Sequence, residues 1–189
     1  MIHPRPFVVA MAVGCGLLAC GAPVATPPTP SATPLSTGTF STVVPANWTN
    51  RVSDATEVAK FSGNGVVEFL IEQGPPGQVK PDVNDVTANI NVLLLSSTVP
   101  DDQVAPYLQS VSNSGAVNLS SPLPFTIDGA TGQYITYDRD IQGTPGESRD
   151  MVINHGGRTY DIVFNTSQYA FTQQLAALQA VLTAWRWSP

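Results

Sequence analysis

The sequence predicts an α+β fold in which an antiparallel sheet carries packed helices. Several runs alternate apolar and polar residues with the period of a strand, and turn residues separate them as in hairpins. Two other segments, at 104–111 and 167–185, repeat apolar residues every three or four positions, as helices do. Strands and helices do not alternate strictly, so helices packed on a sheet are favoured over a parallel βαβ arrangement.

The first 19 residues are typical of an export signal. Arg5 supplies the positive charge, and the uncharged run from Phe7 to Leu18 is shorter than the roughly 20 residues that span a bilayer. Residues 17–20, Leu-Leu-Ala-Cys, resemble the bacterial lipobox, in which the cysteine is acylated and becomes the first residue. We therefore predict a signal peptide at 1–19 and a palmitate-type lipid anchor on Cys20, with an uncleaved membrane stem as the alternative.

A tether is predicted to follow at residues 20–38. This tract holds five prolines among threonine, serine and alanine and carries no charge, so it cannot bury enough apolar surface to fold. It favours extended polyproline II instead. The remaining residues, 39–189, have the length of one domain with a sizeable core.

The charge and cysteine content exclude several kinds of function. Removal of the signal takes Arg5 away and leaves seven basic residues against fourteen acidic ones. Nucleic acid would require a basic face, and docking on anionic headgroups would require basic clusters. Cys15 leaves with the signal and Cys20 is acylated, so the domain has no thiol for a disulfide, a zinc site or a nucleophile. The predicted location is the extracytoplasmic face of a cell membrane, inner or outer.

In the first half of the domain, alternation and turn residues predict four strands. The last of these strands is expected to be central, because it is apolar on both faces towards its end. The strands are predicted at 39–44, 56–61, 66–71 and 87–95. Turns are predicted at 45–48 and 62–65, and a Pro/Gly loop is predicted at 73–85.

In the second half, a helix is predicted after Asp101 and Asp102, which would cap its N-terminus and complement its dipole. Its apolar stripe runs from Val104 to Val111. An extended edge segment is predicted at 117–125. Strands at 133–140, 151–153 and 160–164 should follow, separated by turns at 143–146 and 154–157.

The strongest helix signal is at 167–185, with Thr166 or Ser167 as the N-cap. Its apolar stripe consists of Phe171, Leu175, Leu178, Leu182 and Trp185. These residues recur at intervals of three and four, so one face of the helix should pack on the sheet.

The order of four motifs resembles a known family. Pro-Ala-Asn-Trp at 45–48 ends the first strand, and Asn-Ile-Asn-Val at 89–92 leads into the first predicted helix. Gly-Arg-Thr-Tyr at 157–160 forms a hairpin, and the last helix ends in an aromatic residue. Over about 39–187 this resembles the PsbP/Mog-type α/β/α sandwich of DcrB-like and LpqN-like bacterial lipoproteins. The resemblance implies a non-catalytic accessory or binding protein without a cofactor, linked in LpqN-like members to envelope glycolipids.

Aromatic side chains are the candidate ligand contacts, because aromatic faces suit sugars and lipid tails. The candidates are Trp48, Tyr134, Tyr137, Tyr160 and Trp185, with Trp187 near the C-terminus as a sixth. Packing in the core is the alternative for each of them. A pocket beneath the 167–185 helix would hold an apolar or amphipathic ligand.

Three other patterns are weaker. His155-Gly156-Gly157 is similar to a lipase oxyanion loop, but the chain lacks Gly-x-Ser-x-Gly, so a hairpin turn is favoured. Residues 138–143 resemble a calcium loop, but the residues at positions five and twelve cannot serve. Glu68 and Glu72 could bind a cation or sugar hydroxyls from one strand face, but an ordinary exposed face is favoured.

The sequence therefore predicts an anchored, non-catalytic domain that binds a lipid, a glycolipid or a partner protein of the envelope. No metal, cofactor or nucleic acid is expected. A spacer domain without a ligand and a hydrolase with an unrecognised dyad are the alternatives.

Overall fold

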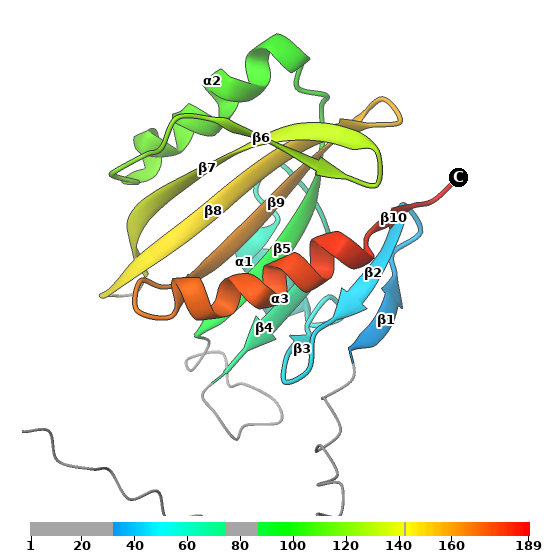
Figure 1. Ribbon diagram of the computed structural model, residues 1–189, viewed down its shortest axis with the longest axis horizontal. Coiled ribbons are helices and arrows are strands. Elements are labelled where there is room, and N and C mark those ends of the chain that lie inside the picture. Colours follow the sequence, from blue (N-terminus) through cyan, green and yellow to red (C-terminus); the bar gives the residue numbers. More distant parts are fainter. Residues whose placement is uncertain (1–31, 75–86, 142) are drawn as a thin grey trace, which may run out of the picture.

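The computed structural model describes residues 32–74, 87–141 and 143–189. Within them, the main sheet has seven strands in the order β3-β4-β5-β9-β8-β7-β6 (Figure 1), and every neighbouring pair is antiparallel. The strands are β3 (Thr49–Asn50), β4 (Gly65–Gln73), β5 (Ala88–Leu95), β6 (Leu123–Ile127), β7 (Ala130–Ile141), β8 (Thr144–His155) and β9 (Arg158–Ser167). The predicted hairpins in the second half of the domain and the central position of β5 are confirmed.

A smaller sheet and the longest helix cover one face of the main sheet. The small sheet has β2 (Phe40–Val44) between β1 (Thr33–Ser36) and β10 (Arg186–Trp187). Beside it, α3 (Phe171–Ala184) packs on β2 and β9. Figure 1 shows α3 crossing the sheet diagonally, with the small sheet along its lower side.

Two short helices pack on the opposite face. Helix α1 (Ala55–Phe61) lies against β4, and α2 (Val104–Gln109) lies against β7 and β8. The 3-10 turns η1 (Asp101–Gln103) and η2 (Ser110–Ser114) flank α2. The sheet thus has helices on both faces, and the predicted α+β sandwich is confirmed.

Alternating residues of the central strands form the core beneath α3. The side chains that face α3 from β4, β5 and β9 are fully buried, and they include Phe69, Ile90, Ile162 and Phe164. Residues at the intervening positions face α1 and α2 in two smaller clusters. Because successive side chains of a strand point to opposite faces, each strand contributes to the packing on both sides of the sheet.

The predicted strand at 56–61 is wrong, because these residues form α1. Asp54 caps the helix by accepting hydrogen bonds from the N–H groups of Thr56 and Glu57, at 3.1 and 3.3 Å. Val58 and Phe61 both pack on the cluster beside β4. Val58 and Phe61 are three residues apart, which fits one face of a helix, while the alternation over 56–61 also fits a strand. The Asp54 cap favours the helix.

The last helix begins later than predicted. Thr166 and Ser167 extend β9, where Ser167 pairs with Gly146 of β8, so neither residue caps α3. The N-cap is Ala170, which makes no side-chain cap bond. Strand pairing between β9 and β8 therefore determines the conformation of Thr166 and Ser167, although both are residue types that commonly cap helices.

The folded domain starts inside the range predicted as tether. Strand β1 pairs with β2 from Thr33↔Val44 to Ser36↔Ser41, and Leu35 packs against the core. Proline at 34 is tolerated because β1 is an edge strand. Residues 20–31 of the predicted tether lie outside the described residues, as do the signal peptide and most of the 73–85 loop.

Glu68 and Glu72 do not share an exposed strand face. A bulge between Val67 and Phe69 interrupts the register at Glu68, whose carboxylate accepts a hydrogen bond from Thr39. Glu72 is only 1% exposed and accepts a 3.0 Å hydrogen bond from Arg51 Nε. The predicted exposed strand face is thus wrong for Glu72, and the alternative of a paired cation or sugar site is not found, because the two carboxylates have separate partners in the described chain.

Asp101 and Asp102 lie in the first turn of η1, but they do not cap it. Pro100 is the N-cap, without a side-chain bond. Asp101 Oδ1 instead accepts a 2.7 Å hydrogen bond from Asn154 Nδ2, which ties η1 to the β8–β9 hairpin. The predicted N-cap role is wrong, although the acidic side chains do stand at the start of the helical segment.

Candidate functional site

Four of the five candidate aromatic residues are core residues. Trp48, Tyr160 and Trp185 lie in the cluster beneath α3, and Tyr137 lies in the cluster beneath α2. Each is at most 8% exposed. They therefore have no free face for a ligand, whereas Tyr134 is half-buried and lines a pocket.

Trp187 continues the aromatic cluster beyond α3. Trp185 stacks on Phe40 with ring centroids 3.7 Å apart, and Trp187 meets Trp185 edge-on at 5.2 Å. The other side of Trp187 stacks on His155 at 4.2 Å. Trp187 thus joins the small sheet to the predicted turn at 154–157, which is confirmed.

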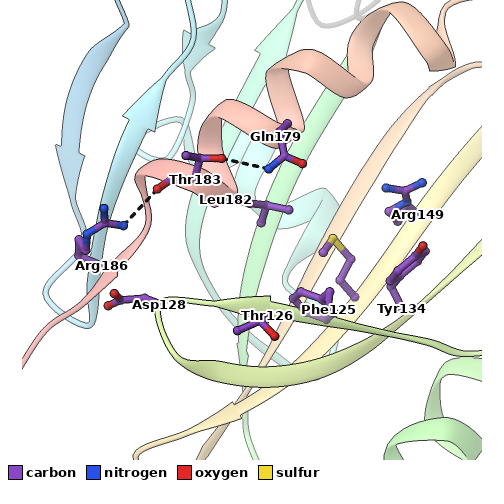
Figure 2. A pocket seen from close by; sticks show the side chains of 10 residues that line it. Phe125, Thr126, Asp128, Tyr134, Arg149, Gln179, Leu182, Thr183 and Arg186 are labelled. Carbon is purple, nitrogen blue, oxygen red and sulfur yellow. Dashed lines mark hydrogen bonds between the residues drawn. The ribbon is translucent and has the colours of Figure 1, made fainter.

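A pocket of about 380 Å³ lies beside α3, between the helix and the β6–β7–β8 end of the sheet. Figure 2 shows Phe125 and Tyr134 from the strands on one side and Leu182 from the helix on the other. Directly beneath the helix the packing is solid, because Leu178 and Val181 are at most 1% exposed. The predicted pocket therefore exists at the flank of the helix and not under it.

The pocket results from the path of α3. The helix packs on β2 and β9 and leaves the inner faces of β6 and β7 uncovered. Gly132 on β7 allows Phe125 of β6 to lie close to the sheet, since a Cβ at 132 would stand 2.7 Å from Phe125 Cε1. Phe125 then meets Tyr134 edge-on at 6.4 Å and forms an aromatic wall.

The pocket has an apolar middle and charged ends. Leu182 of the helix faces the aromatic wall, with Thr126, Gln179 and Thr183 also lining the pocket, while Arg186 and Asp128 stand together at one end (Figure 2). Arg149 stands at the opposite end, beside Tyr134. An arrangement with polar ends and an apolar middle suits an amphipathic molecule.

Arg149 lacks the partners that a half-buried guanidinium normally has. It makes no ion pair within 4.0 Å with any residue that the structure describes, and its buried Nε has no hydrogen-bond acceptor. Its charge lies instead over the rings of Tyr134 and Phe171, at 4.7 and 5.8 Å from their centroids. An unsatisfied buried donor costs about 1–3 kcal/mol, and an incoming anion would remove that cost.

On the opposite face of the sheet, Asp150 and Asp161 form a buried carboxyl pair. Burial raises the pKa of Asp150 well above its usual value, and the charge of neighbouring Asp161 and the hydrogen bond between the two side chains raise it further. Burial also raises the pKa of Asp161, against the hydrogen bonds it accepts from Asp150 and from Tyr107 at 2.8 Å. Burial and Asp150 together raise the pKa of Tyr137 to about 12. Asp150 is therefore expected to keep its proton to a higher pH than an exposed aspartic acid.

Asp150→Asn is expected to make the stability of the protein less dependent on pH. The folded-state pKa of Asp150 is raised, so its stabilising contribution is complete below the unfolded-state value of 3.8 and is lost as pH rises through the folded value. Each unit of elevation corresponds to about 1.4 kcal/mol. Urea unfolding at pH 5, 7 and 9 should show falling wild-type midpoints and flatter ones for the variant. Parallel profiles would contradict this, and exposed Asp102→Asn is the matched control.

The remaining predicted sites contain no ligand cluster in the described chain. Residues 138–141 and 143 lie at the end of the β7–β8 hairpin, where Asp140 accepts a hydrogen bond from the Gly143 N–H, and residue 142 lies outside the described residues. Among residues 32–74, 87–141 and 143–189, no group of three or more His, Cys, Asp or Glu side chains could hold a metal ion. Cys20, the predicted lipidation site, lies outside these ranges. No helix within them is long and apolar enough to cross a membrane.

The pocket residues other than Tyr134 were missed by reasoning from sequence. A signal was present in β8, where Arg149 shares the inward-facing register with Met151 and Ile153. A charged residue beside apolar ones on a covered strand face indicates a partner or a ligand, because burial of an unpaired charge is costly. Arg186 and Phe125 carried no comparable signal, because the path of α3 brings them to the pocket.

Comparison with solved structures finds similar folds at low sequence identity. LpqN, involved in cell envelope biogenesis of Mycobacterium tuberculosis, superposes with a TM-score of 0.58 at 14% identity, covering 84% of this chain and 91% of LpqN. The cyanobacterial PsbP protein CyanoP from Synechocystis sp. PCC 6803 gives 0.54 at 12% identity, over 89% and 99% of the two chains. The Saccharomyces cerevisiae Ran-binding protein Mog1p gives 0.53 at 9%, over 82% and 95%.

Neither protein-family models nor curated proteins give a match to the sequence. The identities to the solved structures are all below 15%, so the likeness concerns the fold. The coverage is nearly complete on both sides, which means that the whole sandwich is shared and not a fragment of it. The chain therefore has the PsbP/Mog-like fold that its sequence motifs predicted.

Proposed function

We propose that this protein is a lipid-anchored lipoprotein of the extracytoplasmic membrane face, whose domain binds an amphipathic envelope component without catalysing a reaction. The observation that carries the binding role is the pocket beside α3, with an apolar middle and charged ends. The lipobox at 17–20 supports the anchor. The fold of LpqN, which is involved in cell envelope biogenesis, supports an envelope role.

The proposed mechanism is capture near a surface. An acylated Cys20 would hold the domain close to the membrane, and this proximity raises its effective concentration for envelope molecules. The pocket would then shield the apolar part of one such molecule between Phe125 and Leu182, each of which lines it. Burial of apolar surface contributes about 25 cal/mol per Å², so contact with these side chains would add to the affinity supplied by the polar groups.

Cys20→Ser is expected to abolish lipidation and membrane association. Cells that express the full chain are labelled with radioactive palmitate, and the protein is followed in gels and in vesicle sedimentation. Cys15→Ser is the matched control, because that cysteine lies within the predicted signal and should not affect labelling. Label on the Cys20→Ser protein, or unchanged sedimentation, would refute the anchor.

The binding role is tested by mass spectrometry of lipids that co-purify with the full chain from its own host. An amphiphile should be enriched on the wild type and lost on Leu182→Glu, which places a charge in the apolar middle of the pocket. Thr172→Glu, an exposed change on the same helix, is the control and should retain it. If neither lipid nor glycolipid is enriched, the domain is a spacer or binds an envelope protein.

A further inference from the structure

Arg149 determines which amphiphile the pocket suits. Two arginines and one aspartate stand among its lining residues, so the pocket is locally cationic in a chain that is acidic overall. The Asp128 carboxylate already accepts a 2.9 Å hydrogen bond from the Trp187 N–H. Arg186 donates to the backbone carbonyl oxygens of Thr183 and Trp185. Arg149 therefore remains as the charged group without a hydrogen-bonding partner in the described chain.

The surroundings of Arg149 hold the guanidinium in place for an anion. Tyr134 and Phe171 face it from β7 and from the first residue of α3, and such ring contacts fix the plane of the group. Glu147 feels the charge of Arg149 but lies beyond ion-pair distance. A positioned guanidinium with free N–H groups matches the paired oxygens of a phosphate or a carboxylate.

The middle of the pocket fits the other half of such a molecule. Met151 lines the pocket but is only 1% exposed, so the apolar surface open to a ligand comes from the half-buried side chains of Phe125 and Leu182. A volume of about 380 Å³ is near the lower limit for small-molecule sites. It therefore suits one headgroup with a single chain segment better than a lipid with two full chains.

We infer that the pocket binds a single-chain anionic amphiphile, with its phosphate or carboxylate on Arg149 and its chain between Phe125 and Leu182. This inference rests on the proposed binding function and specifies the ligand class. It does not conflict with the acidic balance of the chain, because the recognising charge is local and partly shielded by two aromatic rings.

The test uses the full chain in phosphatidylcholine nanodiscs, with empty nanodiscs to subtract partitioning. Monooctyl phosphate, octyl glucoside and inorganic phosphate are titrated by calorimetry. Monooctyl phosphate should bind the wild type more tightly than either of the others. Arg149→Gln should weaken its binding about 10- to 100-fold and leave octyl glucoside unchanged. Arg149→Lys should recover part of the affinity, because it keeps the charge but loses the planar fork.

Exposed Arg158→Gln is the matched control and should bind like the wild type. Near-UV circular dichroism shows whether each variant is folded. If octyl glucoside binds as tightly as monooctyl phosphate, and Arg149→Gln does not weaken the binding of monooctyl phosphate, the anionic ligand class is overturned and the binding function stays intact. Inorganic phosphate binding as tightly as monooctyl phosphate would overturn the amphiphile in favour of a free anion. No binding of any probe, together with no co-purifying lipid, would overturn both proposals.

Discussion

Trp185→Ala should lower the free energy of unfolding by about 3–5 kcal/mol, the range for removal of a large buried aromatic residue. Trp185 is fully buried at the point where α3 ends and β10 begins. Its ring stacks on Phe40 at 3.7 Å and meets Trp187 at 5.2 Å, so it holds the helix, the small sheet and the C-terminus together. Urea unfolding followed by circular dichroism measures the loss.

Two variants show whether packing is the cause. Trp185→Phe keeps an aromatic ring against Phe40 and also removes the buried indole Nε1, which has no hydrogen-bond partner. It should therefore lose clearly less stability than Trp185→Ala. Trp187→Ala, at a half-buried position, should also cost less. A loss below about 1 kcal/mol for Trp185→Ala would show that the cluster does not secure the domain.

Arg51→Met should be comparably destabilising, at about 3–5 kcal/mol, because it leaves buried carboxylates without their countercharge. Arg51 is 4% exposed and pairs with Glu72 at 3.0 Å and Glu57 at 4.0 Å, and both glutamates are only 1% exposed. Methionine has a similar length and no charge. The apolar contacts of the side chain are thus largely kept while the ion pairs are lost.

The effect of Arg51→Met should grow with pH. Burial raises the pKa of Glu72, Glu57 raises it further, and Arg51 opposes both. Without Arg51 the folded-state pKa rises further, so stability is retained at low pH and lost as pH rises through that value. Unfolding at pH 5 and pH 8 should show the larger loss at pH 8.

Matched variants separate the buried charges from general damage. Arg51→Met with Glu72→Gln should recover part of the stability, since one uncompensated carboxylate is removed. Lys60→Met removes a cation whose side chain is 43% exposed, although it also pairs with Glu57, and it should cost less than about 1 kcal/mol. Equal losses for the Arg51 and Lys60 variants would contradict the account.

The spacing of apolar residues in the sequence predicted the long helix and the long strands correctly. The stripe from Phe171 to Leu182 and the alternation in β7, β8 and β9 extend over enough residues for one period to dominate. The short segment at 56–61 fits both periods, so the local pattern could not identify α1. Thr166 and Ser167 have intrinsic capping potential, but pairing with β8 decides their conformation, and that contact is distant in sequence.

The candidate site was predicted less well, because a pocket depends on where elements end and cross. Tyr134 was named among several aromatic residues, but nothing local distinguishes it from Tyr137, three residues further on. Their opposite faces follow from the register of β7, which places Tyr134 opposite Met151 and Tyr137 opposite Ser148. Glu72 looked exposed because its partner Arg51 comes from another segment.

Strand β2 is paired on one side with β1 and on the other with β10, so Phe40 lies opposite Trp187, which is far from it in sequence. The core beneath α3 therefore cannot close until β10 has been synthesised. Such a pairing of distant segments slows folding, since the intervening chain must first be ordered. Until β10 docks, one edge of β2 keeps unpaired backbone groups, and the ring of Phe40 lacks its contact with Trp187.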